Sequence, residues 1–188
     1  MNILLGFAPY IALFLFMRAG SIDAGLWAAF VVALLIAGRN WKSSGSLKVL
    51  EAGTVLLFAA LVVFTAAQHW KWTVMAVRSA VDAGLLAIVL VSLVIGRPFT
   101  LQYAREGVAE QYWHTPLFLT INRRISSVWA GAFAALVVAH TAVIFGPLIP
   151  WWLDIVVTIF ALAAALTFTG WYPEYARKKA GVQVVEPE

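Results

Sequence analysis

Long apolar stretches separated by short polar segments dominate this chain. A helix needs about 20 mostly apolar residues to cross the hydrocarbon core of a bilayer. Six stretches reach or approach that length, at residues 2–18, 24–38, 49–68, 72–95, 128–145 and 152–171. We therefore expect an all-α, polytopic transmembrane bundle of about six spanning helices. The first two stretches are short and closely connected, so a re-entrant hairpin is the chief alternative to two full spans there.

The composition supports a membrane location. Apolar residues make up 63% of the chain and charged residues 12%, whereas a soluble domain is nearer half apolar and one quarter charged. There are no cysteines, which excludes disulfides and thiolate metal sites. No motif indicates a nucleic-acid partner, a cofactor or a metal-ligand set, and we expect none of these.

The basic residues predict the orientation. Under the six-span interpretation, ten of the thirteen Lys and Arg residues fall on one side, which the positive-inside rule makes cytoplasmic. Both termini then lie in the cytoplasm, with residues 1–175 forming a single transmembrane domain and 176–188 a cytoplasmic tail. The ten are Arg39, Lys42, Lys48, Arg97, Arg105, Arg123, Arg124, Arg177, Lys178 and Lys179.

Residues 97–127 form the longest polar connection, between the fourth and fifth predicted helices. Leu101, Ala104 and Val108 share one helical stripe, which predicts an amphipathic helix lying in the membrane interface. Pro116 is expected to end it. The connection is interpreted either as a structural collar or as a surface that recognises a protein or a lipid headgroup. The candidate recognition residues are Arg97, Gln102, Arg105, Glu106, Asn122, Arg123 and Arg124.

Ionisable residues inside the predicted spans form a second candidate site. Arg78 and Asp82 are four residues apart and share one face of the fourth helix. His140 in the fifth helix falls at a similar depth, and Asp154, just inside the sixth, lies nearer the outer surface. All four converge if these helices pack together. Charges at membrane depth are costly and need a reason. They are either a structural ion cluster or a polar site for a proton, an ion or a small ligand.

A weak internal repeat accompanies this pattern. Asp23-Ala24-Gly25-Leu26 begins the second predicted helix, and Asp82-Ala83-Gly84-Leu85 lies within the fourth. Asp154 lies about one helix length before Gly170. Three hairpins in parallel orientation would produce this pattern, and chance among small and apolar residues would produce it too.

A sparse set of residues resembles a known family. Trp70-Lys71-Trp72-Thr73 precedes a long apolar helix, and Gly96-Arg97-Pro98-Phe99 follows it. Trp113, Asn122, Trp129-Ala130 and Phe133 come next in the same order. This order resembles the bacterial intracellular septation protein A family of small inner-membrane proteins. The resemblance implies a multi-pass protein of the bacterial inner membrane that acts in the cell envelope through partners in septum or wall synthesis. It implies no catalytic residues.

Three functions remain open from the sequence. The first is a non-enzymatic envelope protein that contacts lipids, other inner-membrane proteins or a second copy of itself. The second is a transporter, or a binder of a proton or small ligand, that uses Arg78, Asp82 and His140. The third is a lipid-modifying membrane enzyme, although the chain contains no HExxH, GxSxG or phosphate-binding GxxxxGK[ST] motif. We expect that the protein is not an enzyme.

Overall fold

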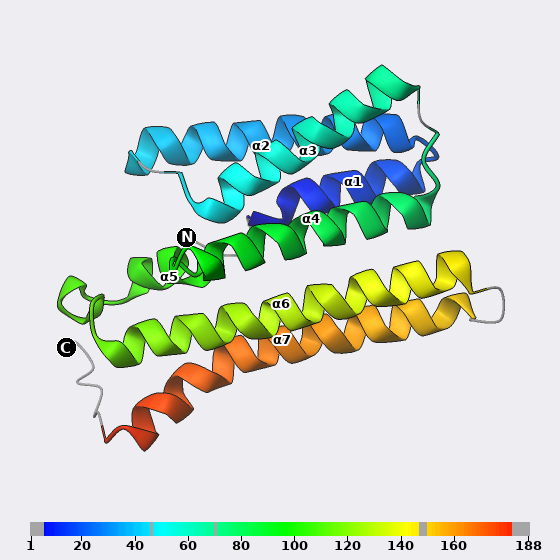
Figure 1. The fold of residues 1–188 in the computed structure, drawn as a ribbon. Helices are drawn as coiled ribbons and strands as arrows, with labels where there is room; N and C mark the ends of the chain where they lie inside the picture. The colour runs from blue at the N-terminus through cyan, green and yellow to red at the C-terminus, as the bar shows by residue number, and fades with distance from the viewer. Residues whose placement is uncertain (1–5, 46, 70, 147–149, 182–188) are drawn as a thin grey trace.

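The computed structural model describes residues 6–45, 47–69, 71–146 and 150–181, and Figure 1 shows its fold. The described residues form helices joined by short connections and contain no strand. In chain order the helices are α1 (Ala8–Arg18), α2 (Ile22–Ser44), α3 (Val49–Gln68), α4 (Val74–Val94), α5 (Phe99–Ala104), α6 (Pro116–Phe145) and α7 (Trp151–Lys179), with single 3-10 turns at Arg105–Gly107 and Glu110–Tyr112.

Five of these helices, α2, α3, α4, α6 and α7, are long and apolar enough to cross a membrane. The predicted all-α bundle is therefore confirmed. α1 is apolar but has only 11 residues, and the start of the predicted first span lies outside the described residues. The count of six crossings stays a prediction. A tight turn joins α1 to α2, with Gly20 at a φ of 89° and the Ser21 side chain accepting a hydrogen bond from Ala24 N.

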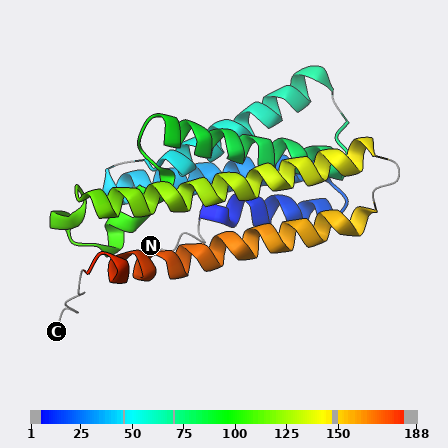
Figure 2. The same cartoon turned by 60° about the horizontal axis from the view of Figure 1, so that its bottom comes forward.

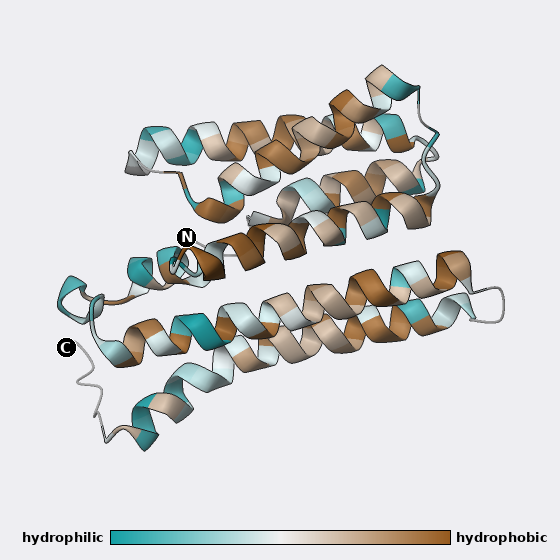
Figure 3. Cartoon of the chain, viewed as in Figure 1, coloured by the Kyte–Doolittle hydropathy of each residue, from teal (hydrophilic) through white to brown (hydrophobic). Residues whose placement is uncertain are grey.

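The long helices lie side by side, and their connections gather at two ends (Figures 1 and 2). One end holds the α2–α3 connection, α5, the start of α6 and the end of α7. We call it the basic end, because the ten basic residues grouped by the sequence lie in or beside these segments. The opposite end holds the α1–α2, α3–α4 and α6–α7 connections. Figure 3 shows hydrophobic colour along the helices between polar ends, as expected for a bundle surrounded by lipid.

Aromatic and glycine residues contribute to the contacts between helices. α6 packs extensively on both α4 and α7, and Trp129 of α6 is buried with its Nε1 donating to Thr169 Oγ1 of α7 at 3.0 Å. α3 approaches α4 at two glycines. A Cβ atom at Gly53 would come within 2.7 Å of Ile88, and one at Gly84 would collide with Leu57, so a larger residue at either position would displace the facing side chain.

The predicted amphipathic helix is wrong in its extent. The chain forms only the six-residue α5 there, followed by the two 3-10 turns. Gly107, a poor helix former, lies in the first turn. Pro116 begins α6 instead of closing the connection, since Pro suits the first helical turn and Thr115 Oγ1 accepts from Phe118 N at 3.4 Å. Asn122, Arg123 and Arg124 therefore belong to a long helix.

The proposed repeat stays a prediction. α2, α4 and α7 do run in the same direction, from the opposite end to the basic end (Figure 1). However, α4 packs more extensively on α6 than on α3, its partner in the proposed hairpin. α7 continues as a helix to Lys179, so the predicted tail begins as helix, and its residues beyond 181 lie outside the described part.

Candidate functional site

Four ionisable side chains from three helices meet near the opposite end of the bundle. His140 of α6 lies between two carboxylates: its Nδ1 is 2.9 Å from Oδ2 of Asp82 on α4, and its Nε2 is 3.2 Å from Oδ1 of Asp154 on α7. Oδ2 of Asp154 is 3.9 Å from an Nη atom of Arg78 on α4. The structure thus brings together all four residues of the intramembrane candidate site. We call this group the histidine cluster.

Helix register puts all four side chains within about 12 Å of the helix ends at the opposite end of the bundle. Arg78 and Asp82 lie about 6 Å and 12 Å along α4 from Val74, at about 1.5 Å per residue. His140 lies five residues before the end of α6 at Phe145. Asp154 lies in the first turn of α7, where a negative side chain interacts favourably with the helix dipole. The packing of α6 against α4 and α7 then closes the cluster.

The centre of the histidine cluster is shielded from solvent. Asp154 is 1% exposed and His140 3%, and Arg78 is the most exposed member, with 35% of its side chain accessible. Charged groups buried at this depth are stable only when paired. The cluster therefore depends on all its members for its charge balance.

The charge of the histidine cluster depends on how many protons its groups carry. A neutral imidazole carries one N–H and one bare nitrogen, whereas an imidazolium donates from both nitrogens. Both nitrogens of His140 lie at ion-pair distance from carboxylate oxygens, although His140 Nδ1 and both Asp154 oxygens have no hydrogen-bond partner among the described residues. An imidazolium at His140, together with Arg78, would balance ionised Asp82 and Asp154, whereas a neutral ring would leave the site with a net charge of −1.

The histidine cluster lies apart from the hollow at the opposite end of the bundle. Among the described residues, no group of three or more histidines and carboxylates is arranged to hold a metal ion. A hollow of about 610 Å³ at the opposite end is lined in part by Asp23, His69 and Lys71, but by none of the cluster residues.

Some candidate recognition residues at the basic end are exposed, and others are buried. Arg97, Arg123 and Arg124 are exposed, and an Nη atom of Arg124 donates to Tyr172 Oη at 2.9 Å. Asn122 is only 2% exposed and donates through Nδ2 to the carbonyl oxygen of Phe118, so it does not belong to an exposed surface.

The remaining candidates at the basic end hold α5 and its following turn in place. Gln102 Oε1 accepts from Val49 N at 2.6 Å, at the start of α3. The Arg105 guanidinium lies over the Trp113 ring, 5.1 Å from its centroid. Glu106 pairs with Lys48. Burial raises the pKa of the Glu106 carboxyl, but the hydrogen bond and charge of Lys48 are among the interactions that lower it, and the pKa lies below its ordinary value. These contacts support the structural collar.

Several buried polar residues near the basic end were missing from the predicted sites. Glu51 is 6% exposed and accepts from Asn40 Nδ2 at 2.7 Å, and Tyr10 Oη lies 2.8 Å from Thr54 Oγ1. Lys48, three residues before Glu51, pairs with Glu106 and not with Glu51. The three-residue spacing of Glu51 and Thr54, on one face of an otherwise apolar helix, is the signal that could have revealed them.

Comparison with known proteins finds no family model, curated protein or solved structure that matches this chain. Its class is therefore defined by the fold and the site: an all-helical protein with five helices able to cross a membrane and an ion cluster buried among three of them. The resemblance to the septation family stays a prediction.

Proposed function

We propose that this protein is an integral membrane protein whose activity is coupled to the binding and release of one proton at the histidine cluster. The observation that supports the proposal is the position of the His140 ring between the Asp82 and Asp154 carboxylates. Histidine is the side chain best suited to exchange a proton near neutral pH. Ionisable groups inside membrane helices are typical of proton relays and ion pathways.

Proton binding would act on the contacts between helices. The protonated ring attracts a carboxylate of α4 on one side and a carboxylate of α7 on the other, so it links both helices to α6. Loss of the proton leaves a bare nitrogen facing a carboxylate oxygen. That repulsion favours a rearrangement in which α4 or α7 moves relative to α6. A proton-coupled conformational change of this kind is what a transporter or a pH-responsive membrane protein requires.

The proposal includes an orientation. With the basic end in the cytoplasm of a bacterial cell, the inner membrane would be crossed six times if α1 and the residues before it complete a span. The histidine cluster then lies in the outer half of the bilayer. Its proton would exchange with the more acidic side of an energised membrane.

Nuclear magnetic resonance of the imidazole nitrogens tests the proposal. His69→Gln with His114→Gln leaves His140 as the single histidine. In lipid nanodiscs, we expect its ring to change reversibly between imidazolium and neutral forms between about pH 5 and pH 9. Asp154→Asn should shift that titration. A ring that keeps one protonation state over the whole range would identify a purely structural ion cluster and overturn the proposal.

A second function follows from the exposed arginines at the basic end. Arg97 and Arg123 are exposed beside the membrane-spanning segments, where basic groups attract anionic lipid headgroups or acidic partners. An envelope protein acting through such contacts, as the septation resemblance implies, would lose its partner when both arginines become glutamine. Crosslinking in cells tests this: a partner recovered equally well with Arg97→Gln/Arg123→Gln would reject this surface.

A further inference from the structure

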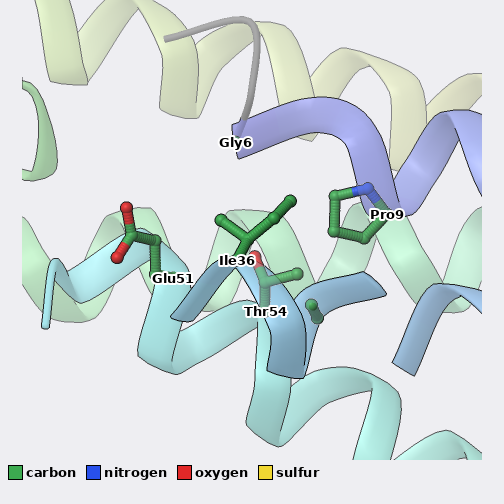
Figure 4. Close-up of a pocket in the computed structure, with 6 residues that line it drawn as sticks. Gly6, Pro9, Ile36, Glu51 and Thr54 are labelled. Atoms are coloured by element: carbon green, nitrogen blue, oxygen red, sulfur yellow. The ribbon is translucent and has the colours of Figure 1, made fainter. Parts of the chain in front are cut away.

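The bundle contains hollows of very different size. A small one between α1, α2 and α3 adjoins Glu51 (Figure 4). Its volume is about 10 Å³, which is about the space required by one water molecule. The hollow at the opposite end is about 610 Å³, within the range of about 300–1,000 Å³ that is typical of ligand-binding sites. Of the two, the larger has room for an organic ligand.

The larger hollow lies where two connections of the bundle come together. It is bounded by the α1–α2 turn, the first turns of α2, the last turns of α3 and the α3–α4 connection. These segments meet at the opposite end of the bundle (Figure 1). We call this space the end hollow. In a bilayer it would open at the level of the lipid headgroups.

The lining of the end hollow changes from polar to apolar along the helix axes. Asp23, His69 and Lys71 lie at its rim, in or beside the connections, and all three are exposed. Leu26 and Val62 line it about 6 Å from the start of α2 and about 9 Å from the end of α3. Leu26 is 1% exposed and Val62 5%, so they form a buried apolar floor. A polar rim above an apolar floor suits a molecule with a polar head and an apolar chain.

Charges of both signs lie at the rim. Asp23 and Lys71 line the same hollow, and neither forms an ion pair with another residue in the part of the chain that the structure describes. Trp27 and Trp72 also line the hollow, and an indole ring attracts a cation to its face. Trp72 Nε1 donates to Thr65 Oγ1 at 2.6 Å, which holds this ring beside α3. The rim therefore offers partners to a cation and to an anion together.

We propose that the end hollow binds a zwitterionic phospholipid. The phosphate lies beside Lys71, and the cationic amine lies beside Asp23 and the two indoles. The first part of an acyl chain packs against Leu26 and Val62. Membrane lipid is the source, because a soluble headgroup would leave the apolar floor uncovered.

The charges favour a zwitterionic lipid over an anionic one. A headgroup that carries only a phosphate pairs with Lys71 but repels the Asp23 carboxylate, whereas an amine on the same headgroup pairs with that carboxylate. The end hollow is lined by none of the histidine-cluster residues. This inference therefore holds or fails independently of the proposed function.

Lipid titrations of the full-length protein in a non-ionic detergent test the site. The thermal unfolding midpoint is measured against the concentration of short-chain phosphatidylcholine, phosphatidylethanolamine or phosphatidylglycerol, and its rise gives the apparent affinity of each lipid. We expect the two zwitterionic lipids to bind about fivefold more tightly than phosphatidylglycerol, which is the upper end of what one exposed ion pair contributes. Free phosphocholine, which has no chain, should bind more weakly than phosphatidylcholine.

Two substitutions separate the two charges of the headgroup. Asp23→Asn should remove the preference for zwitterionic lipid, and Lys71→Gln should weaken the binding of all three lipids. Both residues are exposed, so neither change removes a buried contact. Lys42→Gln makes the same change as Lys71→Gln at an exposed lysine near the basic end. It is the matched control and should bind each lipid like the wild type.

The outcomes decide between a lipid site and a general effect of charge. Equal affinity of the wild type for the three lipids, or a preference that persists in Asp23→Asn, would overturn the proposal. Equal losses of affinity in Lys71→Gln and Lys42→Gln would assign the effect to net charge and reject the site. Phosphocholine that binds as tightly as phosphatidylcholine would reject the role of the apolar floor, and with it the lipid.

Discussion

Replacing His140 and Asp154, singly and together, should show that the two residues contribute to the free energy of unfolding as a coupled pair. His140→Leu leaves Asp82 and Asp154 with only Arg78 to balance two negative charges. Removing one partner of a buried ion pair costs about 3–5 kcal/mol. Asp154 is 1% exposed, so solvent screens its charge only weakly. Asp154→Leu has a smaller effect, because a neutral His140 then leaves Arg78 and Asp82 balanced.

The double variant should be much more stable than the two single costs predict. With both residues replaced by leucine, Arg78 and Asp82 remain, four residues apart on one helix and oppositely charged. Replacing a whole buried ion pair by apolar residues is often nearly neutral. We therefore expect a coupling energy of about 3 kcal/mol between the two substitutions, far above the roughly 0.5 kcal/mol within which independent sites are additive.

Reversible unfolding in mixed detergent micelles measures this coupling, with the intrinsic fluorescence of the nine tryptophans as the signal. Val138→Leu, at a position of α6 that is 67% exposed, serves as the control and should add independently to Asp154→Leu. Additive effects of His140→Leu and Asp154→Leu would refute the reasoning, since they would show that the two side chains do not share a charge balance.

Two further predictions concern other parts of the bundle. Gly84→Val should destabilise the protein by about 1–3 kcal/mol through overpacking, because its Cβ would collide with Leu57. Gly131→Val, with no atom near its Cβ, should cost less. Thermal unfolding in detergent compares the two variants, and equal losses of stability would contradict the packing argument. The Glu106–Lys48 pair should stabilise the fold above the ordinary glutamate pKa of 4.5 and lose that contribution as the pH falls through the lowered pKa of the folded state. Wild type and Glu106→Gln should therefore become more alike in unfolding midpoint as the pH falls, and a constant difference would count against the pair.

The sequence predicted those features that depend on hydropathy and helical spacing. Apolar length identified α3 and α4 nearly to the residue. The depths of Arg78, Asp82, His140 and Asp154 could be counted along the helices, with Asp154 nearest the outer surface, and they indicated convergence if α4, α6 and α7 packed together. The distances that make the histidine ring bridge two carboxylates depend on how α4 and α7 rotate against α6, which no local pattern specifies.

Other features were beyond sequence reasoning for identifiable reasons. Apolar and polar residues in 97–127 are spaced as in an amphipathic helix. However, Thr115 and Pro116 start α6 within this segment, so its second half belongs to α6. The contact of Glu51 with Asn40 joins two helices through a side-chain geometry that spacing does not encode. The contact of Tyr10 with Thr54 likewise depends on how α1 packs beside α3.

The position of the His140 ring between two carboxylates can be measured directly in a lipid bilayer. Solid-state magnetic resonance of the single-histidine protein, with ¹⁵N in the ring and ¹³C in the aspartate carboxyl groups, reports the distance from each ring nitrogen to the nearest carboxyl carbon. We predict that both nitrogens lie within about 4 Å of one, as hydrogen-bond geometry requires, and that Asp82→Asn removes the contact to Nδ1 and Asp154→Asn the contact to Nε2. A carboxyl carbon near only one nitrogen, or near neither, would contradict the account.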